Sequence, residues 1–266
     1  MKKAMFAVLI AIFALSMTAM AQDILGPHNV NGHGCSSCHA PHSGGAGNGG
    51  TNLATGTSLL WGRDFINKTY ATIGGGSITI PSSFASDSDP LFHTGACLSC
   101  HDNAVTTVGM TGTTFETIDG VNHAPTYIAS DPQQLGNDHP VHVAYQPGTA
   151  NHNWPGSVSA AGKITWDLTD PLAANFNNVY GHPARFFAST DQGGTAYVEC
   201  GSCHNPHSMN RVSQTINKVK GYYTSRFFVR GWYDSTNPNS NSATQFCRSC
   251  HYSKSNEAVG LNSTTF

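Results

Sequence analysis

Charged side chains are scarce in this sequence. Lysine and arginine together number 13, aspartate and glutamate number 15, and the four types make up 11% of 266 residues, against roughly 25% in an ordinary globular domain. Nucleic-acid binding requires a concentrated basic patch, and so few positive charges do not supply one. We therefore expect no nucleic-acid partner.

The sequence also lacks an apolar run that is long enough to cross a bilayer. Its most apolar segment, residues 4–15, is too short for a membrane span. Lys2 and Lys3 precede this segment, and Ala19-Met20-Ala21 follows it as an Ala-x-Ala cleavage site. Because this order is that of a secretory signal peptide, we predict a signal peptide over residues 1–21 and an exported chain of residues 22–266 with no membrane span.

No cysteine stands outside a single motif. The eight cysteines form Cys-x-x-Cys-His four times, which is typical of c-type haem attachment. The two thiols bind the vinyl groups of the porphyrin, and the histidine binds the iron. A redox-active dithiol or a four-cysteine zinc site also uses Cys-x-x-Cys, but neither needs the following histidine. We predict four covalent haem c groups, attached at Cys35, Cys38, Cys97, Cys100, Cys200, Cys203, Cys247 and Cys250, with proximal iron ligands His39, His101, His204 and His251.

Methionine is nearly absent from the predicted exported chain. Haem iron in a cytochrome usually takes methionine or histidine as its second axial ligand. Of the six methionines, only Met110 and Met209 lie beyond residue 21, whereas ten histidines lie outside the four motifs. We therefore predict mainly bis-histidine irons of low potential. Because such irons leave no position open for a substrate, the sequence favours electron transfer, and we do not expect an enzyme.

Five histidines have a sequence context that favours a distal iron ligand. His42 and His207 each follow a motif histidine by three residues, so each is too close to bind the same iron and is expected to reach another haem. His139 and His182 each precede a proline, which favours an extended backbone that presents the imidazole. His28 lies just before the first motif. A loop or structural role is the alternative for each. The other histidines are expected to bind no iron: His33, His93, His123, His142 and His152.

Regular periodicity is faint along the chain. The 28 glycines, with many serines, threonines and asparagines, favour loops, and such a composition is also typical of disorder. Four porphyrins would supply the apolar core that the chain lacks. We expect a mostly coil fold with short helices and a few short strands around the haems. One domain would contain two approximate haem-pair halves, residues 22–110 and 199–266, linked by a ligand-supplying segment, residues 111–198.

Several segments together resemble the multihaem cytochromes with doubled Cys-x-x-Cys-His motifs of metal-reducing bacteria. They are His28-Asn29-Val30, residues 35–42, Leu60-Trp61-Gly62-Arg63, residues 97–102, residues 138–141 and residues 200–207. The closest resemblance is to the extracellular tetrahaem cytochrome filaments of the OmcE type. It implies that His28, His42, His139 and His207 are the distal ligands, one of which caps a haem of a neighbouring subunit. His182 departs from that pattern and is a reserve candidate.

These features predict an exported tetrahaem cytochrome that conducts electrons, as a subunit of a polymerising nanowire filament in extracellular electron transfer. Its partners would be copies of itself, other redox proteins, or extracellular metal or electrode acceptors. It would be secreted to the cell surface or beyond. The alternatives are a periplasmic electron shuttle or conduit subunit and, third, a multihaem oxidoreductase, which would need an iron with an open position.

Overall fold

The computed structural model describes the following residues: 25, 28–30, 33–102, 117–118, 121–122, 135–136, 138–149, 154–171, 173–174, 177, 184–189, 193–207, 212–216, 219–223, 228–231 and 246–251. At 117–118, 121–122, 212–216 and 219–223 only the backbone is described. The predicted signal peptide, His123, His152 and the reserve candidate His182 lie outside the described residues.

The described strands are short and pair in antiparallel fashion. β1 (Lys68–Thr72) and β2 (Gly76–Ile80) form a hairpin in which Lys68 pairs with Ile80. β5 (Val143–Ala144), β9 (Ala196–Val198) and β8 (Phe187–Ala188) form a three-stranded sheet in that order. The other two-stranded sheets are β3 (Thr117–Ile118) with β4 (Val121–Asn122), β6 (Gly156–Val158) with β7 (Ile164–Trp166), and β10 (Val212–Ile216) with β11 (Val219–Tyr223).

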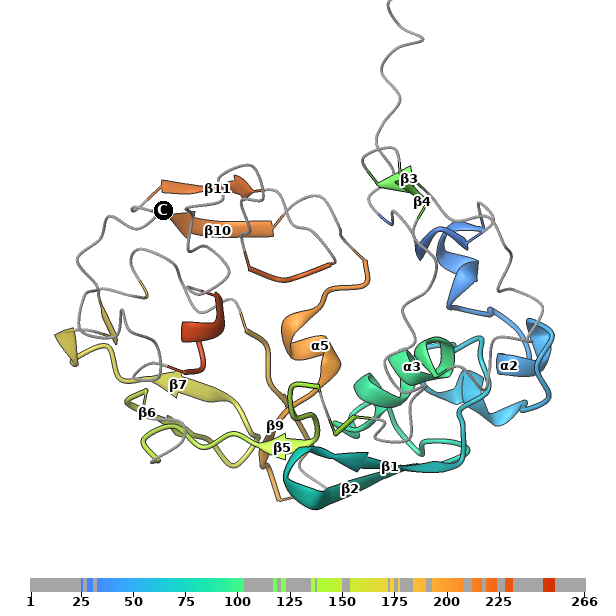
Figure 1. The fold of residues 1–266 in the computed structure, drawn as a ribbon, viewed down its shortest axis with the longest axis horizontal. Helices are drawn as coiled ribbons and strands as arrows, with labels where there is room; N and C mark the ends of the chain where they lie inside the picture. Colours follow the sequence, from blue (N-terminus) through green and yellow to red (C-terminus); the bar gives the residue numbers. More distant parts are fainter. Residues whose placement is uncertain are drawn as a thin grey trace, which may run out of the picture.

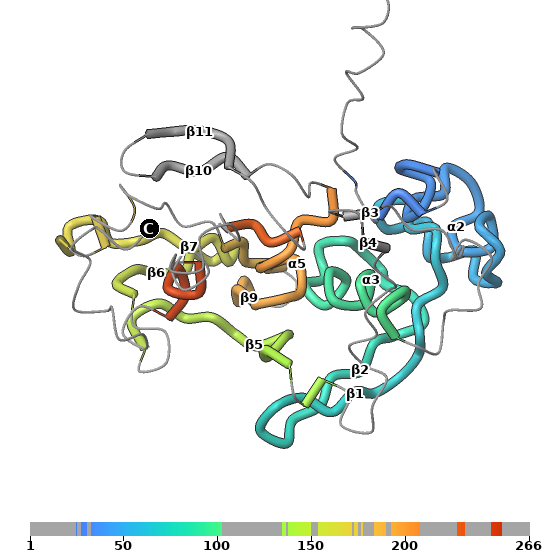
Figure 2. Tube along the Cα trace, turned by 45° about the horizontal axis from the view of Figure 1, so that its top comes forward, coloured from blue at the N-terminus to red at the C-terminus, as the bar shows by residue number. Residues whose placement is uncertain are grey.

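The described helices are short as well. The longest is α3 (Phe92–His101), with ten residues. It contacts α5 (Cys200–Cys203), and Figures 1 and 2 show the two side by side in the middle of the molecule. Among the described residues, no helix is long and apolar enough to span a membrane. The remaining helical turns are η3 (Gly34–Ser37), α2 (Gly44–Gly47), η4 (Ala54–Thr57) and η5 (Ile73–Gly75).

The main apolar core lies between the β1–β2 hairpin and α3. Ile80 at the end of β2 is fully buried, and Gly95 in α3 faces it. A Cβ at Gly95 would lie 3.0 Å from the Phe84 ring, so glycine lets the helix approach the hairpin closely. The hairpin therefore supports the helix that bears the second cysteine motif. The buried residues of this core are Phe65, Tyr70, Ile78, Ile80, Phe84, Phe92, Ala96, Leu98 and Leu135.

A polar contact fixes the C-terminal end of α3 to β1. Asp102, the residue after the helix, is buried, and its Oδ2 accepts a 2.6 Å hydrogen bond from the Tyr70 hydroxyl. The Lys68 ammonium lies 2.9 Å from the same oxygen. Burial and the bond to Asp102 raise the pKa of Tyr70 above its ordinary value. The motif histidine His101, next to Asp102, is thereby held in place from the hairpin.

We predict that Ile80→Ala lowers the free energy of unfolding by about 3 kcal/mol, because it removes buried methylenes and leaves a cavity. Ile73→Ala is the matched control. Ile73 lies on the tip of the same hairpin and is 50% exposed, so its truncation should cost less than about 0.5 kcal/mol. Guanidinium unfolding of the full-length protein measures both. Equal losses would contradict a core between the hairpin and α3.

Candidate functional site

All four cysteine motifs adopt a helical turn. The first lies in η3, the second in the last turn of α3, the third in α5, and the fourth in a helical turn at residues 246–250. In three of them the histidine amide donates to the first cysteine's carbonyl at 3.0 Å. Because side chains three residues apart lie on one helix face, both thiols of each motif point the same way. None of the eight thiols forms a disulfide.

A backbone clamp holds the first motif from a distant segment. The Gly62 amide donates to the Cys38 carbonyl at 2.7 Å, and the Ala40 amide donates to the Leu60 carbonyl at 2.8 Å. Leu60 has a φ of 54°, a left-handed conformation that is rare for a branched side chain. This strain turns the carbonyl of Leu60 toward the residue that follows His39.

The third motif is held by an equivalent clamp. The Arg230 amide donates to the Cys203 carbonyl at 2.8 Å, and the Asn205 amide donates to the Phe228 carbonyl at 2.6 Å. Phe228 also has a left-handed φ, 59°. The internal repeat of the sequence therefore extends to matching tertiary hydrogen bonds, although the clamping segments share no obvious motif.

Thiols of successive motifs lie close together. A hydrogen bond joins Cys97 to Cys200 and, ahead of burial, raises the pKa of Cys97 and lowers that of Cys200. The second and third motifs are thus in contact, across the boundary between the two halves that the sequence suggested. Electrostatic interactions also link Cys38 with Cys100 and Cys203 with Cys247.

Three motif histidines each face one of the candidate distal histidines. Each pair brings together segments that are far apart in the sequence. The distances between ring centres are 6.3 Å for His28 and His101, 6.1 Å for His39 and His207, and 5.9 Å for His139 and His251.

These separations suit a metal ion between the rings. Two imidazoles that bind one metal from opposite sides, through bonds of about 2 Å, have ring centres about 6.3 Å apart. A direct hydrogen bond between two imidazoles would bring the ring centres to about 5 Å. Face-to-face stacking would bring them closer still, as in the 4.0 Å contact between His28 and Phe228. The pairs are too wide for either of these two contacts. Two of them have the geometry of edge-to-face ring pairs, and all three have the separation that axial ligation of one metal requires.

Backbone carbonyls orient one ring of each pair. A carbonyl can only accept, so in each case Nδ1 carries a proton, and Nε2 is the nitrogen that the neutral imidazole offers to a metal. Such bonds are the usual outer-shell partners of ligating histidines. The Nδ1–carbonyl distances are 3.3 Å from His28 to Pro206, 2.7 Å from His39 to Leu59, and 3.0 Å from His139 to Pro140.

Burial keeps His28 in the neutral form that metal ligation needs. The pKa of His28 is lowered to about 4, mainly by burial and also by the neighbouring His101, while the bond to Pro206 opposes the change. An imidazole must be unprotonated to bind a metal. His28 is therefore available as a ligand at neutral pH.

His42 is not brought to a partner in the described residues. Its side chain is exposed on the turn before α2, and no other described ring or polar side chain contacts it. It therefore does not face the remaining motif histidine, His204, which lies in the clamp with its backbone paired to Val229.

Two histidines that the sequence assigned to no iron have other contacts. His93 packs on Phe187 with ring centres 3.7 Å apart. His142 stacks on Tyr197 at 4.7 Å and lies 2.7 Å from the Glu199 carboxylate. Neither is opposed by a motif histidine at the distance of the three pairs.

The surroundings of the first motif suit a large apolar group that bears carboxylates. The guanidinium of Arg63 is buried, and its NH1 has no hydrogen-bond partner among the described residues. A buried charge requires a counter-charge, and a haem propionate would supply one. Leu59 and Leu60, beside His39, are half exposed and would be covered by a porphyrin.

Aromatic residues anchor the fourth motif, and the sequence did not single them out for this role. The indole of Trp154 donates to the Arg248 carbonyl at 2.6 Å, and the Tyr145 hydroxyl donates to the Cys250 carbonyl at 3.2 Å. Both side chains are buried. The predicted linking segment thus supplies structural support to this motif, as well as the ligand candidate His139.

Comparison with known proteins adds nothing to this geometry. No protein-family model, curated protein or solved structure matches the chain. Within the described residues, no three histidine, cysteine, aspartate or glutamate side chains gather into a group that could hold a metal ion.

The buried His93 should make the stability of the protein depend on pH. Burial, followed by the charge of Arg185, lowers the pKa of His93 to about 4. A depressed folded-state pKa adds stability above the unfolded value of 6.5, and that stability is lost as the pH falls toward 4. The free energy of unfolding, measured with guanidinium, should therefore fall between pH 7 and pH 4.5. This fall should be about 1–2 kcal/mol smaller in His93→Phe than in the unaltered protein. An equal fall in both proteins would mean that His93 is not buried in its neutral form.

Proposed function

We propose that this protein is an exported tetrahaem c-type cytochrome that transfers electrons. The observation that carries the proposal is the set of three histidine pairs, each joining a Cys-x-x-Cys-His histidine to a distant one at 5.9–6.3 Å. His28, His139 and His207 would be distal ligands of three irons. His42 and His182 remain the candidates for the fourth iron, at His204.

The role of the chain would be ligation, burial and spacing. A bound haem would supply one-electron redox chemistry. Two imidazoles per iron leave no position for a substrate, which favours transfer over catalysis. The contact between the Cys97 and Cys200 sulfurs, with the electrostatic interactions between the other successive motifs, supports closely spaced haems. In the haem-loaded protein these sulfurs would be thioethers without a proton, so only their proximity carries over.

We further propose that the protein works outside the cell as a polymerising filament subunit, with extracellular metals, electrodes or other redox proteins as acceptors. The support is the resemblance of its sequence segments to extracellular tetrahaem filaments and the exposed position of His42, which is open to a neighbouring subunit. A periplasmic shuttle or conduit subunit is the alternative, because it would use the same motifs and the same histidine pairs.

Replacing His139 by methionine tests the ligand assignment. Methionine ligation raises the potential of a haem relative to histidine, so His139→Met should raise one of four midpoint potentials and leave three unchanged. The matched control is His33→Met, since His33 is an exposed histidine outside the three pairs, and it should change none. Spectroelectrochemical titration of the exported protein measures both variants, and a pyridine haemochrome assay confirms four haems in each.

Two results would contradict the proposal. Unchanged potentials in His139→Met, with four haems attached, would remove His139 as a ligand. A high-spin ferric signal in the unaltered protein would reveal an iron with an open position and favour the oxidoreductase alternative.

Electron microscopy distinguishes the filament from the shuttle. Material sheared from the cell surface should contain filaments whose subunits have the mass of this chain with four haems. His42→Ala should abolish these filaments if His42 caps a haem of the next subunit, while His33→Ala should leave them intact. Monodisperse particles from native preparations of the unaltered protein would instead support the periplasmic alternative.

A further inference from the structure

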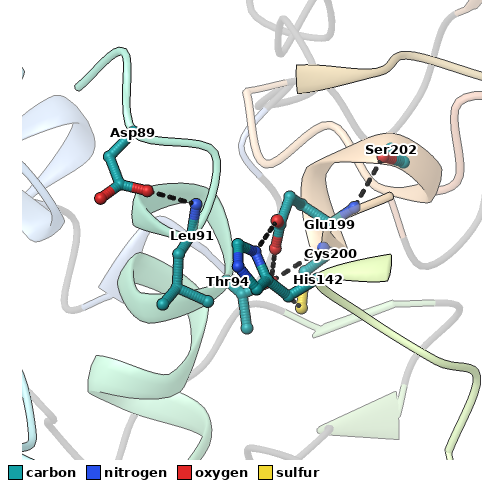
Figure 3. Close-up of polar contacts among 7 residues, drawn as sticks. All are labelled: Asp89, Leu91, Thr94, His142, Glu199, Cys200 and Ser202. Atoms are coloured by element: carbon teal, nitrogen blue, oxygen red, sulfur yellow. Dashed lines mark hydrogen bonds and ion pairs between the residues drawn. The ribbon is translucent and has the colours of Figure 1, made fainter. Parts of the chain in front are cut away.

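A buried carboxylate lies directly before the third cysteine motif. The Glu199 side chain has no exposed surface. It caps the N-terminus of α5, where the Glu199 amide donates to the Ser202 hydroxyl at 2.9 Å and the Ser202 amide returns a bond to the carboxylate. A buried charge is costly unless it is paired. Glu199 therefore needs partners from other parts of the chain, and Figure 3 shows them.

The first partner, Thr94, connects the carboxylate to the haem-attachment sulfur. The Thr94 hydroxyl donates to Glu199 Oε2 at 2.5 Å and lies 3.5 Å from Cys200 Sγ. It also accepts a bond from the Cys200 amide at 3.3 Å. Thr94 is completely buried in α3. The carboxylate is thus one hydroxyl group away from the sulfur that would join a porphyrin.

The second partner, His142, connects the carboxylate to solvent. Its Nδ1 lies 2.7 Å from Glu199 Oε1, and 24% of its side chain is exposed. His142 has a left-handed φ of 54°, and its amide donates to the Val198 carbonyl at 2.7 Å. The imidazole is therefore fixed between a fully buried carboxylate and water, and it provides a route for protons.

The surroundings of Glu199 make the protonation of its carboxylate sensitive to a nearby change of charge. Burial raises the pKa of Glu199, and the bonds from His142 and Thr94 oppose this rise. Charges interact strongly where water is excluded. The other titratable or charged groups around the site are Asp89, His93 and Cys97 on the α3 side, Tyr197 on β9, Cys200 on α5, and Arg185 beside His93.

We propose that the Glu199–His142 pair is a proton-binding site that takes up a proton when the haem on the third motif is reduced, and that Glu199 tunes the potential of that haem. This inference rests on the proposed function, because it requires a haem at Cys200 and Cys203. The electron comes from a one-electron donor, which is oxidised, and the proton comes from water through His142. The iron loses one positive charge, and the pair gains one.

The electrostatic reason is that an ionised carboxylate stabilises the ferric state more than the ferrous state. Reduction weakens that stabilisation, so the affinity of the pair for a proton rises. By reciprocity, a bound proton raises the potential of the haem. The thioether beside Thr94 is the shortest connection between the two sites.

Spectroelectrochemical titration of the haem-loaded, full-length protein between about pH 5 and about pH 8 tests the inference. One of the four midpoints should fall as the pH rises, by up to about 59 mV per pH unit for one proton per electron. In Glu199→Gln that midpoint should lie higher at high pH and lose its slope. The curves of the two proteins should converge at low pH, where Glu199 is already protonated.

Two further variants distinguish the effect of Glu199 on the haem potential from general effects of charge and folding. Asp167→Asn removes a carboxylate that is fully exposed and should leave all four slopes unchanged. His142→Gln keeps the buried carboxylate but removes its partner, so the sloping region should move to higher pH. This variant also tests the inference if Glu199→Gln does not fold.

Identical slopes in the unaltered protein and Glu199→Gln, or an unchanged pH profile in His142→Gln, would overturn the inference. Haem counting on each sample distinguishes this failure from a failure of the proposed function. Four attached haems without the predicted slope would refute only the proton site. An unaltered protein that carries no haem at any of the four motifs would refute the proposed function itself.

Discussion

The separation of about 6 Å between opposed imidazoles is the constraint on which the rest of this structure depends. It is too wide for a hydrogen bond between the rings, so other parts of the chain hold each ring in place. Carbonyls of Leu59, Pro140 and Pro206 bind the Nδ1 atoms, and the backbone clamps fix the turns that bear the histidines. These tertiary hydrogen bonds thus hold the imidazoles of each pair at a fixed separation.

This constraint also explains why short helices and strands suffice. Each cysteine motif needs one helical turn, and each distal histidine needs only a short segment that approaches from elsewhere. Apolar clusters support individual motifs: the hairpin core behind α3, and Trp154 with Tyr145 behind the fourth motif. In the proposed haem-loaded protein, the porphyrins would join these local clusters. Buried polar groups such as Glu199 and the Arg63 guanidinium would then lie close to redox centres.

The sequence predicted the haem-attachment motifs and the types of residue that would bind iron, and covalent attachment stays a prediction. Repetition and spacing identified the motifs. Short contexts identified His207, three residues after a motif histidine, and His139, just before a proline, as ligand candidates. The pairing of histidines could not be predicted, because His28 meets His101 through long-range folding that has no periodic signal. The same holds for the Thr94–Glu199 bond, which spans 105 residues. The spacing of Glu199 and Ser202 is that of a helix-capping box with the two residue types exchanged, and it was not recognised from the sequence.

In the proposed tetrahaem protein, three irons lie between specified pairs of imidazoles. A cryo-electron microscopy structure of the haem-loaded protein, purified from the outside of cells, tests this arrangement most directly. We expect iron density midway between His28 and His101, between His39 and His207, and between His139 and His251. Irons bound by other combinations of histidines, or density for zinc between the cysteines, would contradict it.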